Sequence, residues 1–253
     1  MHLELLKIDN LHKTFKKHRV SAVDGVSFSI FKGEVLGLVG ESGCGKSTLA
    51  RLMLRLIYAD NGSIIYKGKD LLKIPDNEMR KARKNLQIIF QDPYASLDPR
   101  MKTGEVIEEV YNIHRNVTQP KRKSKVIELL ETVGLRETYL NRLPSELSGG
   151  ERQRVGIARA LATDPEFIIC DEPVSSLDIS IQAQILNLLI ELQKRKNLTY
   201  LFISHDLGVI GSICDRVMVM QSGKFVESGP CEGVFKNPGH EYTRALLKAV
   251  FLS

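Results

Sequence analysis

A glycine-rich loop between an apolar run and a helical run places the tightest limit on this fold. Residues 34–39, EVLGLV, precede the loop GESGCGKST at 40–48, and a helical pattern begins at Lys46. The loop matches the pattern G-x-x-x-x-G-K-[ST], which requires a strand before it and a helix after it. A short apolar run of this kind is typical of a strand buried on both faces of a parallel sheet. We therefore expect a parallel α/β core.

Strand and helix patterns alternate again in the second half of the chain. The segments FIICDEP, TYLFISHD and RVMVMQSG are typical of buried strands, and DISIQAQILNLLIELQKR is typical of a helix whose apolar face carries Ile181, Ile185, Leu188 and Leu192. This alternation predicts a mainly parallel sheet with helices on its faces. The first thirty residues have the pattern of short strands.

Between about Asp92 and Leu161 the pattern becomes helical. The segments TGEVIEEVYNIH, KSKVIELLETVG and GERQRVGIARAL have helical periodicity with little strand character. We therefore expect a single domain over 1–253, in which residues 1–91 and 162–253 form the α/β core and residues 92–161 form a helical insertion.

Composition narrows the classes of function. The net charge is +6, but the lysines and arginines are scattered apart from short groups at 80–84 and 121–125, so no nucleic-acid partner is expected. No apolar stretch reaches the roughly 18–20 residues that cross a bilayer, so work at a membrane would be that of a peripheral subunit. The four cysteines lack Cys-x-x-Cys spacing and are expected to be thiols in a reducing cytosol.

The loop at 40–48 is expected to bind phosphate groups. Its glycines let backbone N–H groups face phosphate oxygens, Lys46 supplies a positive charge to the β- and γ-phosphates, and the Ser47 hydroxyl can ligate Mg²⁺. Cys44 occupies a variable position of the pattern. The candidate nucleotide contacts are Gly40, Glu41, Ser42, Gly43, Cys44, Gly45, Lys46, Ser47 and Thr48.

Polar side chains follow several of the predicted strands. Asp171 could hold Mg²⁺, usually through water, and Glu172 could act as the general base that activates the attacking water. His205 and Gln91 also stand at strand ends, which converge on one crevice in a doubly wound sheet. We expect His205 to contact the γ-phosphate and Gln91 to touch both Mg²⁺ and water. Each of these signals taken alone also suits a structural role.

The segment LSGGERQRV at 147–155 is a second candidate anion site. Two glycines directly before a helical run leave bare amide groups at a helix start, which attracts anions. Together with the other motifs it resembles the nucleotide-binding subunit of ATP-binding-cassette (ABC) transporters over essentially the whole chain. GESGCGKST resembles the Walker A loop, FIICDE the Walker B strand, LSGGERQRV the family signature, SSLD at 175–178 the D-loop, and His205 the switch histidine.

The resemblance implies a fold, an activity and cofactors. The fold is an α/β P-loop NTPase core with a mainly parallel sheet, an N-terminal antiparallel β subdomain and a helical signature subdomain. The activity is an ATPase coupled to transmembrane transport, with ATP and Mg²⁺ as cofactors. In this family two subunits face each other head to tail, and each ATP lies between the Walker A loop of one subunit and the signature of the other. The residues expected to reach the partner's ATP are Ser148, Gly149, Gly150 and Glu151.

Three further positions carry expectations from the resemblance. Asp178 of the D-loop is a candidate nucleotide contact, and Phe15 matches the position of the family's tyrosine that stacks on adenine, although an ordinary core phenylalanine fits as well. Glu151 stands where the family usually has glutamine. A carboxylate aimed at the γ-phosphate would repel it, so either Glu151 points elsewhere or this chain caps the partner's ATP more weakly.

Two segments resemble the peptide, opine and nickel uptake branch of the family: FQDPYASLDPRM at 90–101 and NPGHEYTRALLKAV at 237–250, the latter with Glu241 in place of the usual proline. The sequence ends three residues later without the cysteine-bearing tail of many peptide importers, which inclines the expectation toward nickel or another metal chelate over a peptide. The implied function is ATP hydrolysis that powers import of such a solute.

The implied partners are a second ABC ATPase subunit, identical or different, two integral-membrane permeases and, indirectly, an external solute-binding protein. A permease coupling helix would enter near Gln91 and residues 92–105, at the cytoplasmic face of the membrane. One alternative is a soluble ABC ATPase acting on nucleic acid or ribosomes. Such proteins usually carry two cassettes or long coiled coils, and this sequence shows one cassette and no sustained heptads. The other alternative is the ATPase of an exporter, against which the import-branch segments weigh.

Overall fold

The computed structural model describes residues 3–15, 20–114 and 117–251. The chain forms two compact units. The first comprises Met1–Arg80 and Leu198–Ser253, and the second comprises Lys81–Asn197. Among the described residues, no helix has both the length and the apolar character that crossing a membrane requires.

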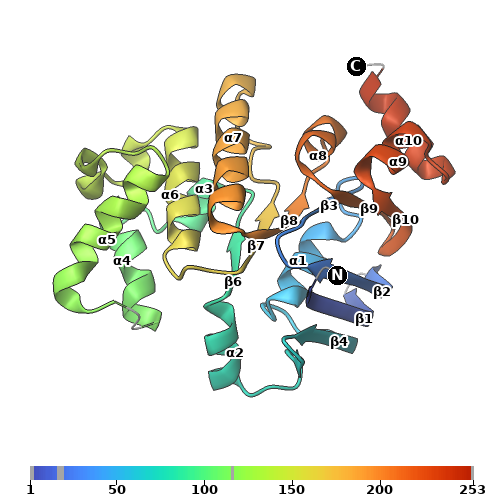
Figure 1. The fold of residues 1–253 in the computed structure, drawn as a ribbon, viewed down its shortest axis with the longest axis horizontal. Helices are drawn as coiled ribbons and strands as arrows, with labels where there is room; N and C mark the ends of the chain where they lie inside the picture. The colour runs from blue at the N-terminus through green and yellow to red at the C-terminus, as the bar shows by residue number, and fades with distance from the viewer. Residues whose placement is uncertain (1–2, 16–19, 115–116, 252–253) are drawn as a thin grey trace. The chain divides into compact units, whose positions relative to one another are not determined.

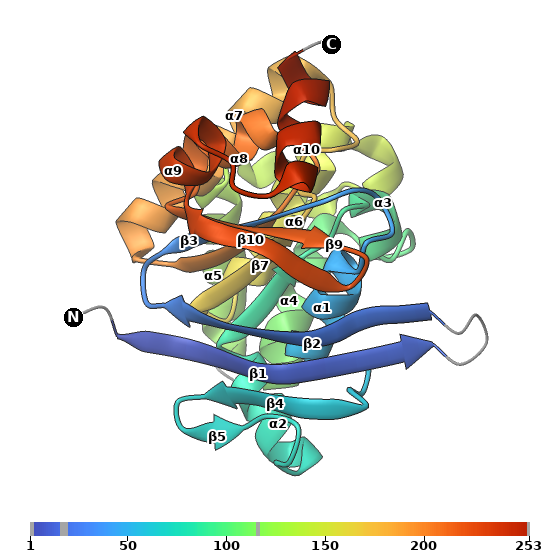
Figure 2. The same cartoon turned by 90° about the vertical axis from the view of Figure 1, so that its right-hand side faces the viewer.

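The first unit contains an antiparallel sheet in the order β2-β1-β4-β5 (Figure 2). Its strands are β1 (Glu4–Phe15), β2 (Val20–Phe31), β4 (Asn61–Tyr66) and β5 (Lys69–Asp70). The antiparallel β subdomain is thus confirmed, but β1 and β2 have 12 residues each, so the expectation of short strands is wrong. The pairing of β1 with β2 shifts register between Ile8 and Leu11, and Asn10 has a φ of 46°. Such irregularities break the alternation of apolar residues and make one long strand resemble two short ones.

A second group of strands in this unit has the order β10-β9-β3-β8. β3 (Val35–Val39) is parallel to both β8 (Thr199–Ile203) and β9 (Arg216–Gln221), while β10 (Lys224–Pro230) is antiparallel to β9. Every residue of β3 and of β8 is buried, as expected for central strands covered on both faces. The predicted parallel core is therefore confirmed.

Helices follow these strands. α1 (Lys46–Met53) begins within the glycine-rich loop, α8 (Leu207–Ile213) follows β8, and α9 (Cys231–Lys236) and α10 (Glu241–Phe251) follow β10, drawn in red in Figure 1. α2 (Asp76–Arg83), which the sequence analysis did not identify, lies at the boundary of the two units. Asp206 caps α8 because its carboxylate accepts hydrogen bonds from the N–H groups of Gly208 and Val209.

The second unit contains the parallel pair β6 (Leu86–Ile89) and β7 (Phe167–Asp171) and most of the helices. α4 (Thr103–His114), α5 (Gln119–Thr132) and α6 (Gly149–Leu161) match the three predicted helical segments, and they lie side by side (Figure 1). The remaining elements are α3 (Pro93–Ser96), the 3₁₀ helices η1 (Glu137–Asn141) and η2 (Pro144–Glu146), and α7 (Ile179–Lys196). That residues 92–161 act as a separate subdomain stays a prediction.

The apolar face of α7 is turned slightly from the predicted one. Ile185 and Leu192 are buried as expected, but the third buried residue is Leu189. Ile181 and Leu188 are only half-buried. The three buried positions follow the i, i+4, i+7 spacing of a helix with 3.6 residues per turn.

Candidate functional site

The predicted phosphate loop lies in the first unit, between β3 and α1. At two of its glycines, neighbouring backbone atoms leave no room for a side chain. A Cβ atom at Gly40 would lie 2.2 Å from the Met220 carbonyl oxygen, and one at Gly45 would lie 2.0 Å from that of Ala22. Both residues also have positive φ angles, of 153° and 117°. Glycine is the residue that tolerates both conditions, so the loop has the backbone curvature that the sequence pattern predicts.

Lys46 lies inside this loop. Its side chain is buried, and its ammonium group donates hydrogen bonds to the carbonyl oxygens of Gly40, at 2.7 Å, and Glu41, at 2.9 Å. The Cys44 sulfur lies 3.8 Å from the same nitrogen. Burial raises the pKa of the Cys44 thiol, with Lys46 acting in the opposite direction, so the thiol stays protonated at neutral pH. The Lys46 ammonium group thus lies against the backbone of the loop.

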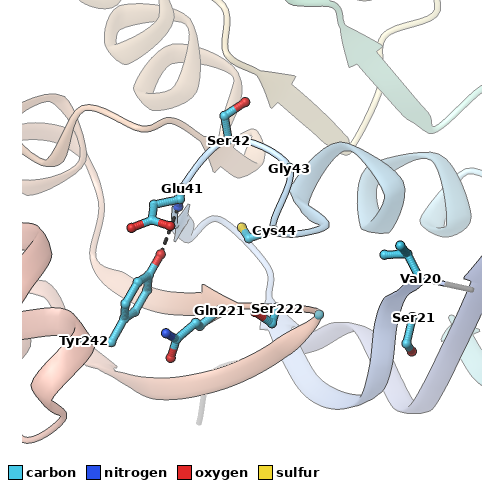
Figure 3. A pocket seen from close by; sticks show the side chains of 10 residues that line it. Val20, Ser21, Glu41, Ser42, Gly43, Cys44, Gln221, Ser222 and Tyr242 are labelled. Carbon is cyan, nitrogen blue, oxygen red and sulfur yellow. Dashed lines mark hydrogen bonds between the residues drawn. The ribbon is translucent and has the colours of Figure 1, made fainter. Parts of the chain in front are cut away.

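A pocket of about 270 Å³ borders the loop on one side (Figure 3). One wall is the first half of the loop, another is the turn between β9 and β10, and a tyrosine of α10 closes a third side. The lining residues are Val20, Ser21, Glu41, Ser42, Gly43, Cys44, Gln221, Ser222, Gly223 and Tyr242. Four predicted nucleotide contacts, residues 41–44, therefore face a hollow of the protein.

Two other predicted residues of the first unit are exposed. His205 lies between β8 and α8. Phe15 ends β1 with 41% of its surface exposed, and the Lys13 ammonium lies 5.9 Å from the centre of its ring. The alternative of an ordinary core phenylalanine is therefore wrong. Stacking of adenine on this ring stays a prediction.

In the second unit the structure brings Gln91 and Glu172 together. The side-chain amide of Gln91 donates a hydrogen bond of 2.8 Å to Oε2 of Glu172. Asp171, the last residue of β7, is buried, and the chain turns sharply after it because Glu172 has a φ of 48°. A left-handed conformation at a residue other than glycine costs on the order of 1–3 kcal/mol and concentrates at functional sites.

The signature segment of the second unit is organised by reciprocal capping at the start of α6. The Ser148 hydroxyl accepts a hydrogen bond of 3.3 Å from the Glu151 N–H, and Oε2 of Glu151 accepts one of 2.7 Å from the Ser148 N–H. This is a capping box, which the spacing S-x-x-E could have predicted. The Tyr139 hydroxyl donates to the other oxygen of Glu151. Both carboxylate oxygens are thus engaged within the chain.

These contacts lower the pKa of Glu151, chiefly through the Tyr139 hydroxyl and then through the Ser148 N–H. Two donors partly offset its negative charge, which reduces the repulsion expected toward an anion at this helix start. Tyr139 lies in η1. Sequence reasoning missed it because no local pattern links η1 to the signature.

The two signature glycines have a packing role that the sequence analysis did not foresee. A Cβ atom at Gly150 would lie 2.5 Å from Cγ2 of Ile181, and one at Gly149 would lie 3.1 Å from Cδ2 of Leu177. Asp178, the predicted D-loop contact, caps α7 by accepting hydrogen bonds from the Ile181 N–H and the Ser180 hydroxyl. The signature and the D-loop therefore pack directly against each other.

Comparisons with known proteins agree on one family. A family model described as ABC transporter matches residues 23–175. The chain is 53% identical to the oligopeptide transport ATP-binding protein OppF of Bacillus subtilis, over 98% of this chain and 82% of that protein. It is 48% identical to the dipeptide transport ATP-binding protein DppF of Haemophilus influenzae, over 92% of this chain and 72% of that protein.

Two solved structures have the same fold. One is the dimeric ATP-binding cassette MJ0796 bound to ADP and Pi, with a TM-score of 0.81 and 28% identity, covering 90% of this chain and 99% of that chain. The other is cbiO1 of Clostridium perfringens, part of the ABC transporter complex cbiONQ, with a TM-score of 0.80 and 27% identity, covering 98% of this chain and 95% of that chain. The chain therefore belongs to the ABC transporter family, as one of its ATPase subunits.

Proposed function

We propose that this chain hydrolyses ATP to power the uptake of peptides through a separate membrane permease. The observation that carries the proposal is 53% identity, over 98% of the chain, to a protein named for oligopeptide transport. The sequence-based preference for nickel or a metal chelate receives no support from the relatives described above. Their names are those of transport proteins, which also disfavours a soluble ATPase acting on nucleic acid or ribosomes.

The residues of the first unit suit a nucleoside triphosphate. The curved backbone of the phosphate loop and the start of α1 offer N–H groups to phosphate oxygens, and Lys46 supplies positive charge from within the loop. Phe15 offers an exposed ring to adenine, and His205 is proposed to contact the γ-phosphate. The proposed nucleotide contacts of the loop are the residues from Gly40 to Thr48.

The polar groups of the second unit suit the chemical step. Glu172 takes the proton of the attacking water, and Gln91 orients the carboxylate through its amide. Gln91 and Asp171 of this unit are proposed Mg²⁺ ligands, Asp171 through water, and Ser47 of the first unit is a third; their oxygens are the donors that Mg²⁺ prefers. Bound Mg²⁺ would neutralise charge on the phosphates.

The signature is proposed to cap the ATP of a partner subunit. Ser148, Gly149, Gly150 and Glu151 form the capped start of α6, and Asp178 of the adjacent D-loop is a further proposed contact. The solved relative MJ0796 is described as dimeric, which supports this arrangement. Two anion sites on separate chains would then bind one ATP from both sides, so that ATP joins the subunits. Hydrolysis of the ATP would let the subunits separate.

The proposed assembly places this chain at the cytoplasmic face of the membrane. Its partners are a second ATPase subunit, two permeases and, indirectly, an external solute-binding protein. The relative cbiO1 belongs to a multi-subunit transporter complex, which supports such an assembly. We propose that residues 92–161 form a helical subdomain and that a permease helix docks near Gln91 and residues 92–105.

Reconstitution of the transporter tests the proposal. The chain would be combined in proteoliposomes with its partner ATPase, permeases and binding protein, and uptake of a labelled oligopeptide would be compared with uptake of nickel. We expect ATP-dependent uptake of the peptide, abolished by Glu172→Gln. Uptake of nickel without peptide, or uptake that does not depend on ATP, would overturn the proposed cargo or the proposed energy source respectively.

A further inference from the structure

The segment NPGHEYTRALLKAV carries a tyrosine that contacts the phosphate loop. Tyr242 lies in the first turn of α10 and is buried. Its hydroxyl oxygen accepts a hydrogen bond of 3.1 Å from the N–H of Glu41, the second residue of the loop (Figure 3). Burial raises the pKa of Tyr242, so the hydroxyl stays protonated at neutral pH. A segment 201 positions away in sequence thus reaches the nucleotide loop.

The peptide group between Gly40 and Glu41 is held at both of its ends. Its N–H donates to Tyr242, and its carbonyl oxygen, that of Gly40, accepts the 2.7 Å hydrogen bond from the Lys46 ammonium. In a trans peptide the N–H and C=O bonds point in opposite directions within one plane. Fixing the direction of the N–H therefore fixes the direction in which the carbonyl meets Lys46.

The tyrosine is itself placed by a fixed turn. The Glu227 carboxylate of β10 accepts hydrogen bonds from the N–H groups of Gly239, at 2.7 Å, and His240, at 3.1 Å. The Arg244 guanidinium donates to the carbonyl oxygens of Pro238 and Gly239. These bonds join the start of α10 to the sheet, so the Tyr242 ring has little freedom to leave the loop.

We propose that Tyr242 is a positioning residue for the nucleotide site, which orients the Gly40–Glu41 peptide and through it the Lys46 ammonium. It is not a catalytic residue, because its contact is with the loop backbone. The segment NPGHEYTRALLKAV, which resembles the peptide, opine and nickel uptake branch, then forms part of the support of the phosphate loop. This inference rests on the proposed binding of nucleotide by that loop.

The test is Tyr242→Phe, which removes the hydroxyl and keeps the ring. Tyr58→Phe, at an exposed tyrosine of the same unit, is the matched control. Affinity for a fluorescent ATP analogue would be measured by equilibrium titration of the full chain, with Tm measured in parallel. Because one hydrogen bond is at stake, we expect Kd to rise about 3- to 10-fold in Tyr242→Phe, and to stay unchanged in Tyr58→Phe.

A second variant separates positioning from general stability. Glu227→Gln weakens the turn that holds Tyr242, so its effect on Kd should be less than additive with that of Tyr242→Phe. A lower Tm with unchanged Kd in Tyr242→Phe would overturn the inference and leave only a structural role. Absence of binding by the wild-type chain would instead overturn the nucleotide site itself.

Discussion

The side-chain amide of Gln91 donates a hydrogen bond to the carboxylate of Glu172 over 2.8 Å, across 81 positions of the chain. Gln91 stands just before α3, and Glu172 follows β7 in a left-handed conformation. The contact fixes the orientation of the carboxylate that we propose as the general base. A displacement of the segment that carries Gln91 would therefore break this hydrogen bond or reorient the carboxylate.

Glu172→Gln should slow hydrolysis by about 10²- to 10⁴-fold and leave nucleotide binding intact, because it removes the general base and keeps the side-chain shape. Gln91→Ala acts on the same carboxylate, so adding it to Glu172→Gln should slow the reaction little further. Single-turnover hydrolysis with the partner subunit present measures both effects. Normal turnover in Glu172→Gln would show that another group is the base.

Ser148→Arg should act on the partner's nucleotide. The substitution places a bulky cation at the start of α6, while the chain's own phosphate loop belongs to the other unit. The isolated variant should bind ATP like wild type, and ATP-driven dimerisation with a wild-type partner, measured by light scattering, should be lost.

The matched control is Ser148→Ala, which removes the helix cap, at a cost of about 1 kcal/mol, without adding bulk. It should weaken dimerisation less than the arginine does. If a folded Ser148→Arg chain lost ATP binding as a monomer, both anion sites would serve one nucleotide, and the shared arrangement would be wrong.

Gly150→Ala should destabilise the chain by about 1–3 kcal/mol, because the new methyl group would lie 2.5 Å from Cγ2 of Ile181. Urea unfolding measures the change. Gly150→Ala should lower the free energy of unfolding less in an Ile181→Ala background than in the wild-type chain. Gly156→Ala, in the same helix, is the control.

At Gly156 a Cβ atom would meet no atom of the described part of the chain within 4 Å, apart from its chain neighbours and the nearby backbone of its own helix. Alanine is the better helix former by about 0.8–1 kcal/mol, so this variant should be neutral or more stable than wild type. Equal destabilisation by both substitutions would mean that contact with Ile181 is not the cause.

The contribution of Glu151 to stability should depend on pH. Its pKa lies below the ordinary value of 4.5 because the Tyr139 hydroxyl and the Ser148 N–H bind the ionised form. Its stabilisation is therefore complete above the unfolded pKa and is lost as the pH falls through the folded pKa. Glu151→Gln should lower the free energy of unfolding at about pH 7, and its difference from wild type should shrink at about pH 3.5.

Urea unfolding of both proteins across this range gives the measurement, with Glu131→Gln at an exposed position of α5 as the control. A difference between wild type and Glu151→Gln that stays constant with pH would show that ionisation of Glu151 plays no part.

The core of the fold could be predicted because its signals are local. The apolar runs of β3, β7 and β8 and the glycine pattern at 40–45 each identify an element from neighbouring residues alone. The length of β1 could not be predicted in this way, because its bulge near Asn10 interrupts the alternation on which strand prediction depends.

The supports of the candidate site were the least predictable part. Tyr139 reaches Glu151 from η1, and Tyr242 reaches Glu41 from the far end of the chain. Both contacts depend on tertiary structure, and neither residue stands in a pattern that names its partner. The spacing S-x-x-E of Ser148 and Glu151 is sufficient to predict their capping box. The resemblance to the family, which usually has glutamine at position 151, led only to an expectation about the charge of Glu151.

Lys46 donates two of its three N–H groups to the carbonyl oxygens of Gly40 and Glu41. The third is directed at the Cys44 sulfur, a weak acceptor 3.8 Å away, so an incoming phosphate oxygen can bind there while both carbonyl contacts stay in place. A neutral oxygen would gain only a hydrogen bond at this position. An oxygen with full negative charge gains an ion pair as well. The lysine thereby makes the loop favour anionic ligands over neutral ligands of similar shape.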